Sequence, residues 1–299
     1  MKRVLLSVIL VGVLLLNTVP AQAGFFTDRK AIKAQIQYEK NCKKDIEELF
    51  AKQENYAKAY DIKGLENIYA QNFIDNDGYN KDVYFSLIQD TWDTYPDITY
   101  TTKIKDIKLN GDYATVETEE FAVATSDDMD RHIVGELNST SKCLYHLQKA
   151  ANKWKITSEQ VLEEISTLKY GNARYINMTI ESPKVIGANQ QYTATLRVDA
   201  PENSMVVASI NQEKIVNPAE KPEDHFMKLA DDNTLSRIFT ANTDNVNEYN
   251  VASIGITDTS RTINGEIRVA MNGLAFVMTR VNVIPINNFA KVDRKTEDK

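Results

Sequence analysis

The feature that most constrains the fold is a change in apolar period near Tyr95-Pro96-Asp97. Before this point, apolar residues recur every three or four positions, which is typical of amphipathic helices. After it, segments rich in Thr, Ile, Val and Tyr are separated by turn residues, which is typical of β-strands. Helices followed by strands predict an α+β fold, in which N-terminal helices pack on a curled antiparallel sheet.

Three helices are predicted before this change. A long amphipathic helix is expected over residues 27–60, where apolar side chains form a stripe between charged ones. A shorter helix follows over residues 62–69. A third begins near Asn80, carries an apolar face as far as Trp92, and ends at the proline that follows.

The strongest strand signal is Asn110-Gly111, because this pair supplies the positive φ angles that a tight hairpin turn needs. It predicts a hairpin made of residues 98–109 and 113–125. Further strands of the same sheet are expected at residues 132–137, 141–149 and 154–157.

The C-terminal half shows only short strands, which predicts an all-β, immunoglobulin-like sandwich of two sheets. Asn272-Gly273 predicts a hairpin between its last two strands. The expected strands are residues 175–181, 192–198, 205–210, 236–241, 249–257, 266–271 and 274–283. The predicted domains are residues 24–168 for the helices and curled sheet, 169–286 for the sandwich, and 287–299 for a charged, disordered tail.

The N-terminus has the pattern of a cleavable signal peptide. Lys2 and Arg3 precede an apolar run from Val4 to Leu16, and small residues before Gly24 suit cleavage after Ala23. Spanning a bilayer takes about 20 apolar residues, so this run is too short for a retained membrane anchor. We expect residues 1–23 to be removed and the mature protein to be periplasmic or secreted.

Charge and motifs argue against several classes of function. The formal net charge is −7, with both signs interspersed, so we expect no nucleic-acid partner. The sequence has no serine-hydrolase elbow, zinc-protease motif, Cys-x-x-Cys pair or glycine-rich phosphate loop. Its three histidines lack metal-ligand spacing, so neither a metal nor a cofactor is expected.

Several segments between about residues 45 and 165 resemble the nuclear-transport-factor-two-like superfamily, which includes SnoaL-like and ketosteroid-isomerase-like proteins. They are Tyr56-Ala57-Lys58-Ala59-Tyr60, residues 61–69, Asn72-Phe73-Ile74-Asp75, the helix to Trp92, and Lys153-Trp154-Lys155-Ile156. The resemblance implies a cone-shaped sheet around an apolar pocket. In that superfamily the pocket serves isomerases, cyclases, dehydratases or pure binders, and many members pair through the outer sheet face, so a homodimer is one expectation.

The resemblance also suggests site residues. The catalytic candidates are Asp75 or Asp77 as the carboxylate base, together with Tyr56 and His146. The expected ligand pocket is lined by Tyr56, Tyr60, Trp92 and His146. A structural interpretation stands beside this one, because short acids in an Asp-Asn-Asp-Gly turn bond their own backbone, and tyrosines four apart on a helix pack in a core.

Cys42 and Cys143 are the two cysteines of the chain. In an oxidising compartment they could form a disulfide. The alternative is that both are small buried side chains.

Three functions follow as hypotheses. The first is an exported, noncatalytic protein whose cone binds a small apolar molecule or an envelope protein, with the sandwich as a docking domain. The second is an isomerase or lyase of the SnoaL or ketosteroid-isomerase type, acting on a small apolar carbonyl compound. The third is a structural envelope adaptor whose cone is filled by its own side chains.

Overall fold

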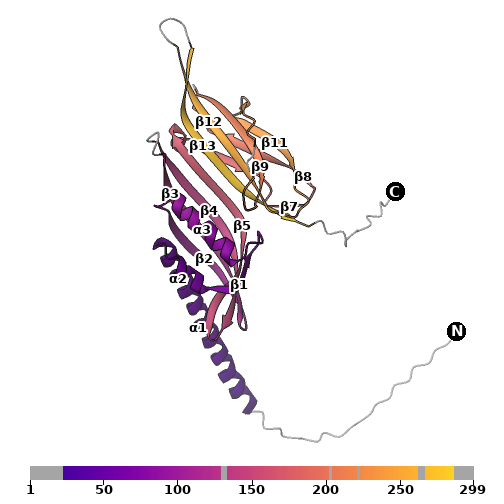
Figure 1. Ribbon diagram of the computed structural model, residues 1–299. Helices are drawn as coiled ribbons and strands as arrows, with labels where there is room; N and C mark the ends of the chain where they lie inside the picture. Colours follow the sequence, from indigo (N-terminus) through magenta and orange to yellow (C-terminus); the bar gives the residue numbers. More distant parts are fainter. Residues whose placement is uncertain (1–22, 129–132, 202–203, 221–222, 262–266, 286–299) are drawn as a thin grey trace, which may run out of the picture. The chain divides into compact units, whose positions relative to one another are not determined.

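The computed structural model describes residues 23–128, 133–201, 204–220, 223–261 and 267–285 (Figure 1). The chain forms two compact units, residues 1–44 and residues 45–299. The predicted signal peptide, apart from Ala23, and the predicted tail at residues 287–299 lie outside the described residues.

The three helices occur where the sequence predicts them: α1 spans Ala23–Lys58, α2 spans Ile62–Ile68 and α3 spans Lys81–Thr94. The side chain of Asp61 caps α2, and that of Asn80 caps α3 by accepting from the backbone N–H of Val83. Within the described residues, none of the helices combines the length and apolar character that a membrane span requires.

One ten-stranded, mainly antiparallel sheet runs through the second unit, in the order β10-β9-β12-β13-β5-β4-β3-β2 (Figure 1). Eight of the ten described strands follow this order, and the other two pair with it in parallel: β1 (Tyr69–Asp75) with β5 and β7 (Val185–Gly187) with β13. The long strands are β2 (Thr99–Asn110), β3 (Tyr113–Asp128), β4 (Ile133–Ala150), β5 (Lys153–Gly171), β9 (Ser204–Lys214), β12 (Glu248–Arg261) and β13 (Ile267–Ile284), and β10 is Met227–Lys228.

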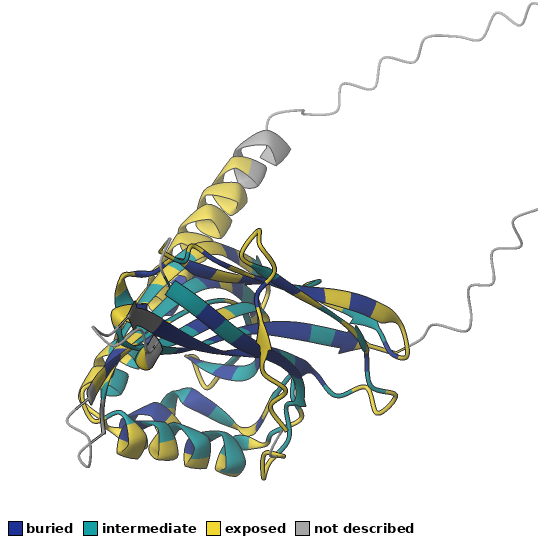
Figure 2. Cartoon of the chain, turned by 90° about the horizontal axis from the view of Figure 1, so that it is seen from above, coloured by how far each residue is buried: buried dark blue, intermediate teal, exposed yellow. Residues whose placement is uncertain are grey.

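A second sheet has three strands, β11 (Thr234–Thr240), β8 (Gln191–Val198) and β6 (Met178–Glu181), and a short 3₁₀ helix, η1 (Asn172–Tyr175), leads into it from β5. Apolar side chains of this sheet share one buried cluster with side chains of β9, β12 and β13, as Leu196, Ile210 and Ile254 illustrate. Buried residues accordingly concentrate on the strands, whereas the turns between them are exposed (Figure 2).

The two Asn-Gly signals have different outcomes. The first is confirmed as a hairpin, in which β2 and β3 pair from Asn110 and Tyr113 onwards and Gly111 has a φ of +60°. The second is wrong as a hairpin, because β13 continues through Asn272-Gly273 and Asn272 is an extra residue in its pairing with β12. Glycine is required there because a Cβ on Gly273 would lie 2.7 Å from the backbone nitrogen of Ala173.

The strands are also longer than predicted. The two strands expected at residues 132–137 and 141–149 form the single strand β4, and β5 continues well beyond the expected end at Thr157. The last part of β5, from Ile165 to Gly171, pairs with β13. The predicted boundary at 168/169 therefore falls inside a strand, and an independent immunoglobulin-like sandwich stays a prediction. Below, residues 45–171 are called the cone and residues 172–285 the C-terminal half.

A buried ion pair joins these two parts. Arg280 of β13 has a side chain only 1% exposed, and its Nη1 donates to Asp77 Oδ2 at 3.0 Å while its Nη2 donates to the other oxygen. The amide of Asn247 also donates to Asp77, at 2.8 Å. The turn that precedes α3 is thereby fixed to the C-terminal half.

We expect Asp77→Asn to lower the free energy of unfolding by about 3–5 kcal/mol, because the buried Arg280 would lose the carboxylate that pairs with it. Urea denaturation followed by tryptophan fluorescence measures this change. Glu119→Gln is the matched control, since the side chains of the Lys105–Glu119 pair are 55% and 25% exposed and its loss should cost about 1 kcal/mol or less. Equal losses in the two variants would contradict the structural role given to Asp77.

Candidate functional site

A cavity of about 240 Å³ lies between the helices and the curled sheet of the cone. Its wall is mainly aromatic and polar. The residues that define its character are Gln53 of α1, Tyr84, Ile88 and Trp92 of α3, Tyr100 of β2, Glu120 of β3 and Tyr145 of β4. The cone is therefore not completely filled by its own side chains.

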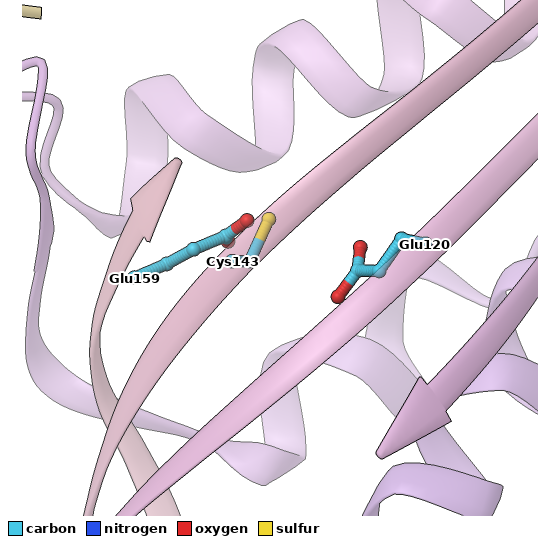
Figure 3. A group of neighbouring side chains, drawn as sticks. All are labelled: Glu120, Cys143 and Glu159. Carbon is cyan, nitrogen blue, oxygen red and sulfur yellow. The ribbon is translucent and has the colours of Figure 1, made fainter. Parts of the chain in front are cut away.

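Two glutamates lie together beside this cavity, with a cysteine between them (Figure 3). Glu120 comes from β3, Cys143 from β4 and Glu159 from β5, and one polar atom of each lies within 4.8 Å of the others. Glu120 lines the cavity, and Glu159 is 7% exposed. This cluster is the candidate functional site.

Strand register places these side chains on one face. Thr118 lies opposite Cys143, and Tyr145 lies opposite Glu159. Because side chains alternate along a strand, Glu120 shares the face of Thr118, and Cys143 shares that of Tyr145. The pairing of β4 with β5 shifts in register between Lys142 and Cys143 and again between His146 and Leu147. These irregularities determine which residue of β4 lies opposite Glu159.

Hydroxyl groups hold both carboxyl groups. Tyr145 and Thr118 each donate to Glu120 Oε1 at 2.8 Å. Tyr84 donates to Glu159 Oε2 at 2.5 Å. All three donors are neutral, so these hydrogen bonds orient the pair without balancing its charge.

Burial of Glu120 and Glu159, and the repulsion between their negative charges, therefore favour protonation of this carboxyl pair. Burial, with a further contribution from the charge of Glu120, raises the pKa of Glu159 to about 8. Burial also raises the pKa of Glu120. The two groups titrate as a pair, which holds a proton at neutral pH.

Burial and the neighbouring carboxyl groups also affect the thiol of Cys143 and the ability of the cluster to bind a metal ion. Burial, and then the charges of Glu120 and Glu159, raise the pKa of Cys143 far above its usual range, so the thiol stays neutral. Glu120, Cys143 and Glu159 are the group of described residues whose donor atoms could hold a metal ion. Metal ligation requires deprotonated thiol and carboxyl groups, so a metal ion would have to displace the protons that this cluster otherwise holds.

Two polar atoms in the cavity wall are buried without a hydrogen-bond partner, Nε1 of Trp92 and Oε1 of Gln53. Trp92 is only 3% exposed. Gln53 uses its Nε2 to donate to the hydroxyl of Tyr69 at 2.8 Å. Both atoms are enclosed by protein, and Nε1 of Trp92 interacts with the hydroxyl of Tyr100.

Of the four residues predicted to line the pocket, Trp92 does so. Tyr60 packs edge-on against Trp92 at a ring distance of 5.3 Å, and its hydroxyl donates to the backbone oxygens of Pro96 and Ile98. Tyr56 lies against Gly64, where an added Cβ would come within 2.5 Å of its ring. His146 lies beside a separate surface pocket, because the alternation of β4 turns Tyr145 inward and His146 outward.

The predicted carboxylate bases lie elsewhere. Asp75 accepts from the backbone N–H groups of Asp77 and Tyr79, which is the turn chemistry of the structural interpretation, and burial raises its pKa. Asp77 is engaged by Arg280. Both line a second cavity, of about 360 Å³, between the cone and the C-terminal half, whose wall also includes Glu159.

Sequence reasoning missed Glu120 and Glu159. Every second residue of β3 faces inward, beginning with the buried residues Ala114, Val116 and Thr118, and Glu120 is the next in this series. This alternation could have identified Glu120 from the sequence. Glu159 follows the predicted end of its strand, and no local pattern indicated that the strand continues.

The disulfide, one of the two alternatives that the sequence left open, is not formed among the described residues. Cys42 and Cys143, both within the described residues, are buried as separate thiols. They belong to different compact units of the chain. The alternative interpretation, two small buried side chains, matches this arrangement.

The raised pKa of Glu159 predicts a pH-dependent stability. Between its unfolded value of 4.5 and its folded value of about 8, the folded state keeps a proton that the unfolded state has released. The stabilising contribution is complete below the unfolded pKa and is lost as pH rises through the folded one. The free energy of unfolding should fall by a few kcal/mol over this range, at about 1.4 kcal/mol per pKa unit.

Glu159→Gln should remove most of this slope, since glutamine keeps an acceptor for Tyr84 but does not titrate. Urea denaturation between about pH 5 and pH 9 measures it. Glu119→Gln, on the opposite face of β3 from Glu120, should retain the wild-type slope. A slope that survives Glu159→Gln would mean that other groups cause it.

The chain has distant likenesses to solved structures. No family model matches it, and no curated protein sequence does. It is similar to Bd1075 from Bdellovibrio bacteriovorus, with 17% identity and a TM-score of 0.33, over 40% of this chain and 39% of that one. The chain thus matches about two fifths of the length of Bd1075.

Two further likenesses cover most of the other protein. One is to a protein from Streptomyces avermitilis described as a dehydratase of the NTF2-like family, with 12% identity and a TM-score of 0.34, over 40% of this chain and 93% of that one. Another is to hexachlorocyclohexane dehydrochlorinase LinA-type3 from Novosphingobium barchaimii, with 11% identity and a TM-score of 0.33, over 41% of this chain and 86% of that one. The similar structures thus include an NTF2-like protein, the group that the sequence resembles. At these identities and TM-scores they carry no information on reaction or substrate.

Proposed function

We propose that the cone binds a small molecule in its cavity and that the Glu120–Glu159 pair transfers protons to and from it. The observation that supports this most directly is a cavity-lining carboxyl group beside a buried carboxyl whose pKa is about 8. A general acid or base works best when its pKa lies near the working pH. Two carboxyl groups that share a proton provide one of each.

The geometry suggests a role for each group. Glu120 lines the cavity, so it is the group that exchanges a proton with the ligand. Glu159 holds the shared proton behind it, and Tyr84 and Tyr145 orient the two carboxyl groups. The reaction class is proton abstraction next to a carbonyl, as in an isomerase or lyase. This keeps the predicted class but replaces the predicted residues.

The second candidate is a noncatalytic binding protein. It is favoured by the hydrogen bonds from Thr118 and both tyrosines, which account for the buried pair as a satisfied structural network. In either case the C-terminal half is proposed as the part that docks to an envelope partner.

The first test measures deuterium incorporation next to the carbonyl of 3- and 4-hydroxyacetophenone in heavy water. We expect the wild-type protein to accelerate this exchange, and Glu120→Gln to reduce the acceleration by about 10²-fold or more. Glu119→Gln on the outer face of the same strand should match the wild type. Binding without Glu120-dependent exchange would favour the noncatalytic candidate.

We also propose that the protein acts outside the cytoplasm, on the strength of its N-terminal residues. Expression of the full chain in a bacterium should yield an exported species that begins at Gly24. Intact-mass measurement of the periplasmic and cytoplasmic fractions checks this. An uncleaved chain confined to the cytoplasm would contradict it.

A further inference from the structure

Two cavities meet at the Glu120–Glu159 pair. Glu120 lines the cavity of about 240 Å³ in the cone, whereas Glu159 lines the second cavity, of about 360 Å³. Tyr84, Ile88 and Tyr100 line both, so these side chains separate two neighbouring spaces. The carboxyl pair therefore has one member in the wall of each cavity.

A proton that the pair gives to a ligand must be replaced from solvent before the pair can act again. A ligand in the first cavity would cover Glu120, so replacement from that side is blocked while the ligand is bound. The second cavity is open to solvent, because its wall includes partly exposed side chains such as Asp75, Tyr79 and Thr91. Its volume is many times the roughly 10–15 Å³ that one water molecule needs.

Asp75 lies directly opposite Glu159 in the sheet. The two are register partners in the parallel pairing of β1 with β5, and the backbone N–H of Asn76 donates to the backbone oxygen of Glu159 at 3.0 Å. Neighbouring strands lie about 4.8 Å apart, and side chains directly opposite each other share one face of the sheet. Both side chains line the second cavity, and the charge of Asp75 is one of the causes that raise the pKa of Glu159.

The turn bonds of Asp75 leave it able to carry a proton. Its Oδ1 accepts from the backbone N–H groups of Asp77 at 3.0 Å and of Tyr79 at 2.8 Å. Both bonds use the same oxygen, so Oδ2 can take up and release a proton without breaking the turn. Burial raises the pKa of Asp75, so this carboxyl group binds a proton more readily than an exposed one.

The other ionisable groups of this wall are occupied or neutral. Arg280 donates to both oxygens of Asp77, so that carboxylate is held in an ion pair. Asp75 and Glu159 are the carboxyl groups of this wall that form no ion pair within the described part of the chain. Burial raises the pKa of each tyrosine in the wall, so the hydroxyls stay neutral: Tyr79, Tyr84, Tyr100 and Tyr249.

We infer that Asp75 relays protons between solvent and the carboxyl pair, passing them to Glu159 through water in the second cavity. One O–H bond breaks at Asp75 as one forms at Glu159, and Asp75 then regains a proton from solvent. The reverse steps remove a proton that the pair has taken from a ligand. This inference rests on the proposed function and adds a relay residue to it, since Asp75 was predicted as a base that touches the ligand.

The test measures how fast the pair exchanges a proton with solvent, and it needs no substrate. After a light-induced pH jump, time-resolved infrared spectroscopy of the purified protein follows the C=O band of protonated carboxyl groups, and Glu159→Gln identifies the band of the pair. We expect Asp75→Asn to slow this exchange by about 10-fold or more. Each variant is measured at the midpoint of its own band titration, because Asp75→Asn also removes a charge that raises the pKa of Glu159.

Two controls separate a relay from a structural role. Asp61→Asn is the matched variant, because Asp61 also accepts a backbone N–H, from Gly64 at 2.9 Å, but lines neither cavity, and its exchange should keep the wild-type rate. Asparagine at position 75 keeps an oxygen that accepts from the turn, so the fold should persist. Azide, a small weak acid that can enter the second cavity, should restore the rate in Asp75→Asn by carrying protons, which it could not do for a distorted structure.

The outcomes distinguish this inference from the proposed function. Slow exchange in Asp75→Asn that azide restores supports the inference, even if Glu120→Gln leaves deuterium incorporation into the ketone unaffected and the catalytic proposal fails. An unchanged rate, or a slow rate that azide does not restore, would overturn the inference and leave the proposed function standing. Absence of any band that depends on Glu159 near neutral pH would overturn both, because the pair would then hold no proton.

Discussion

Along β5 the backbone pairs with β4 on one side, and with β1 and then β13 on the other. Backbone N–H and C=O groups must be paired when they are buried, so a strand with neighbours on both sides is held along much of its length. The other parts of the structure depend on this arrangement. It places Glu159 opposite Tyr145, and it continues the sheet of the cone into the C-terminal half.

Burying two adjacent carboxylates in a protein core would normally lower the free energy of unfolding. Desolvation opposes two adjacent negative charges, so the pair retains a proton and accepts hydrogen bonds from neutral hydroxyls. Asp77 is buried in a different way, because Arg280 balances its charge. The same chain thus buries carboxyl groups as a proton store in the cone and as an ion pair at its edge, and only the first arrangement is suited to acid–base chemistry.

The sequence predicted local features well where a short pattern determines them. The helix limits followed from capping residues such as Asn80 and from the proline after α3, and the hairpin at Gly111 followed from its positive φ. Asn272-Gly273 has similar local chemistry, but the partner strand β12 continues past it, so a bulge forms instead of a turn. The pairing of β13 with the distant strand β12 determines that a bulge forms there, and a local sequence pattern carries no information on such pairing.

The candidate site was harder to predict from the sequence, because it also depends on the pairing of distant segments. Its residues come from α3, β3, β4 and β5, and the register between strands decides which side chains meet. Asp75 and Asp77 were predicted because they stand at the expected place in the chain, yet their turn chemistry explains them. Trp92 was identified by its helical face and does line the cavity.

The place of β13 in the sheet also has a consequence for synthesis. Residues 267–284 are synthesised well after residues 165–171, yet they pair with the edge of β5 that the cone presents. Until they arrive, the segment from Ile165 to Gly171 is an unpaired strand edge, which is a surface on which other chains can add. The nascent protein therefore depends on β13 for protection against aggregation, and a chain truncated before β13 would expose that edge permanently.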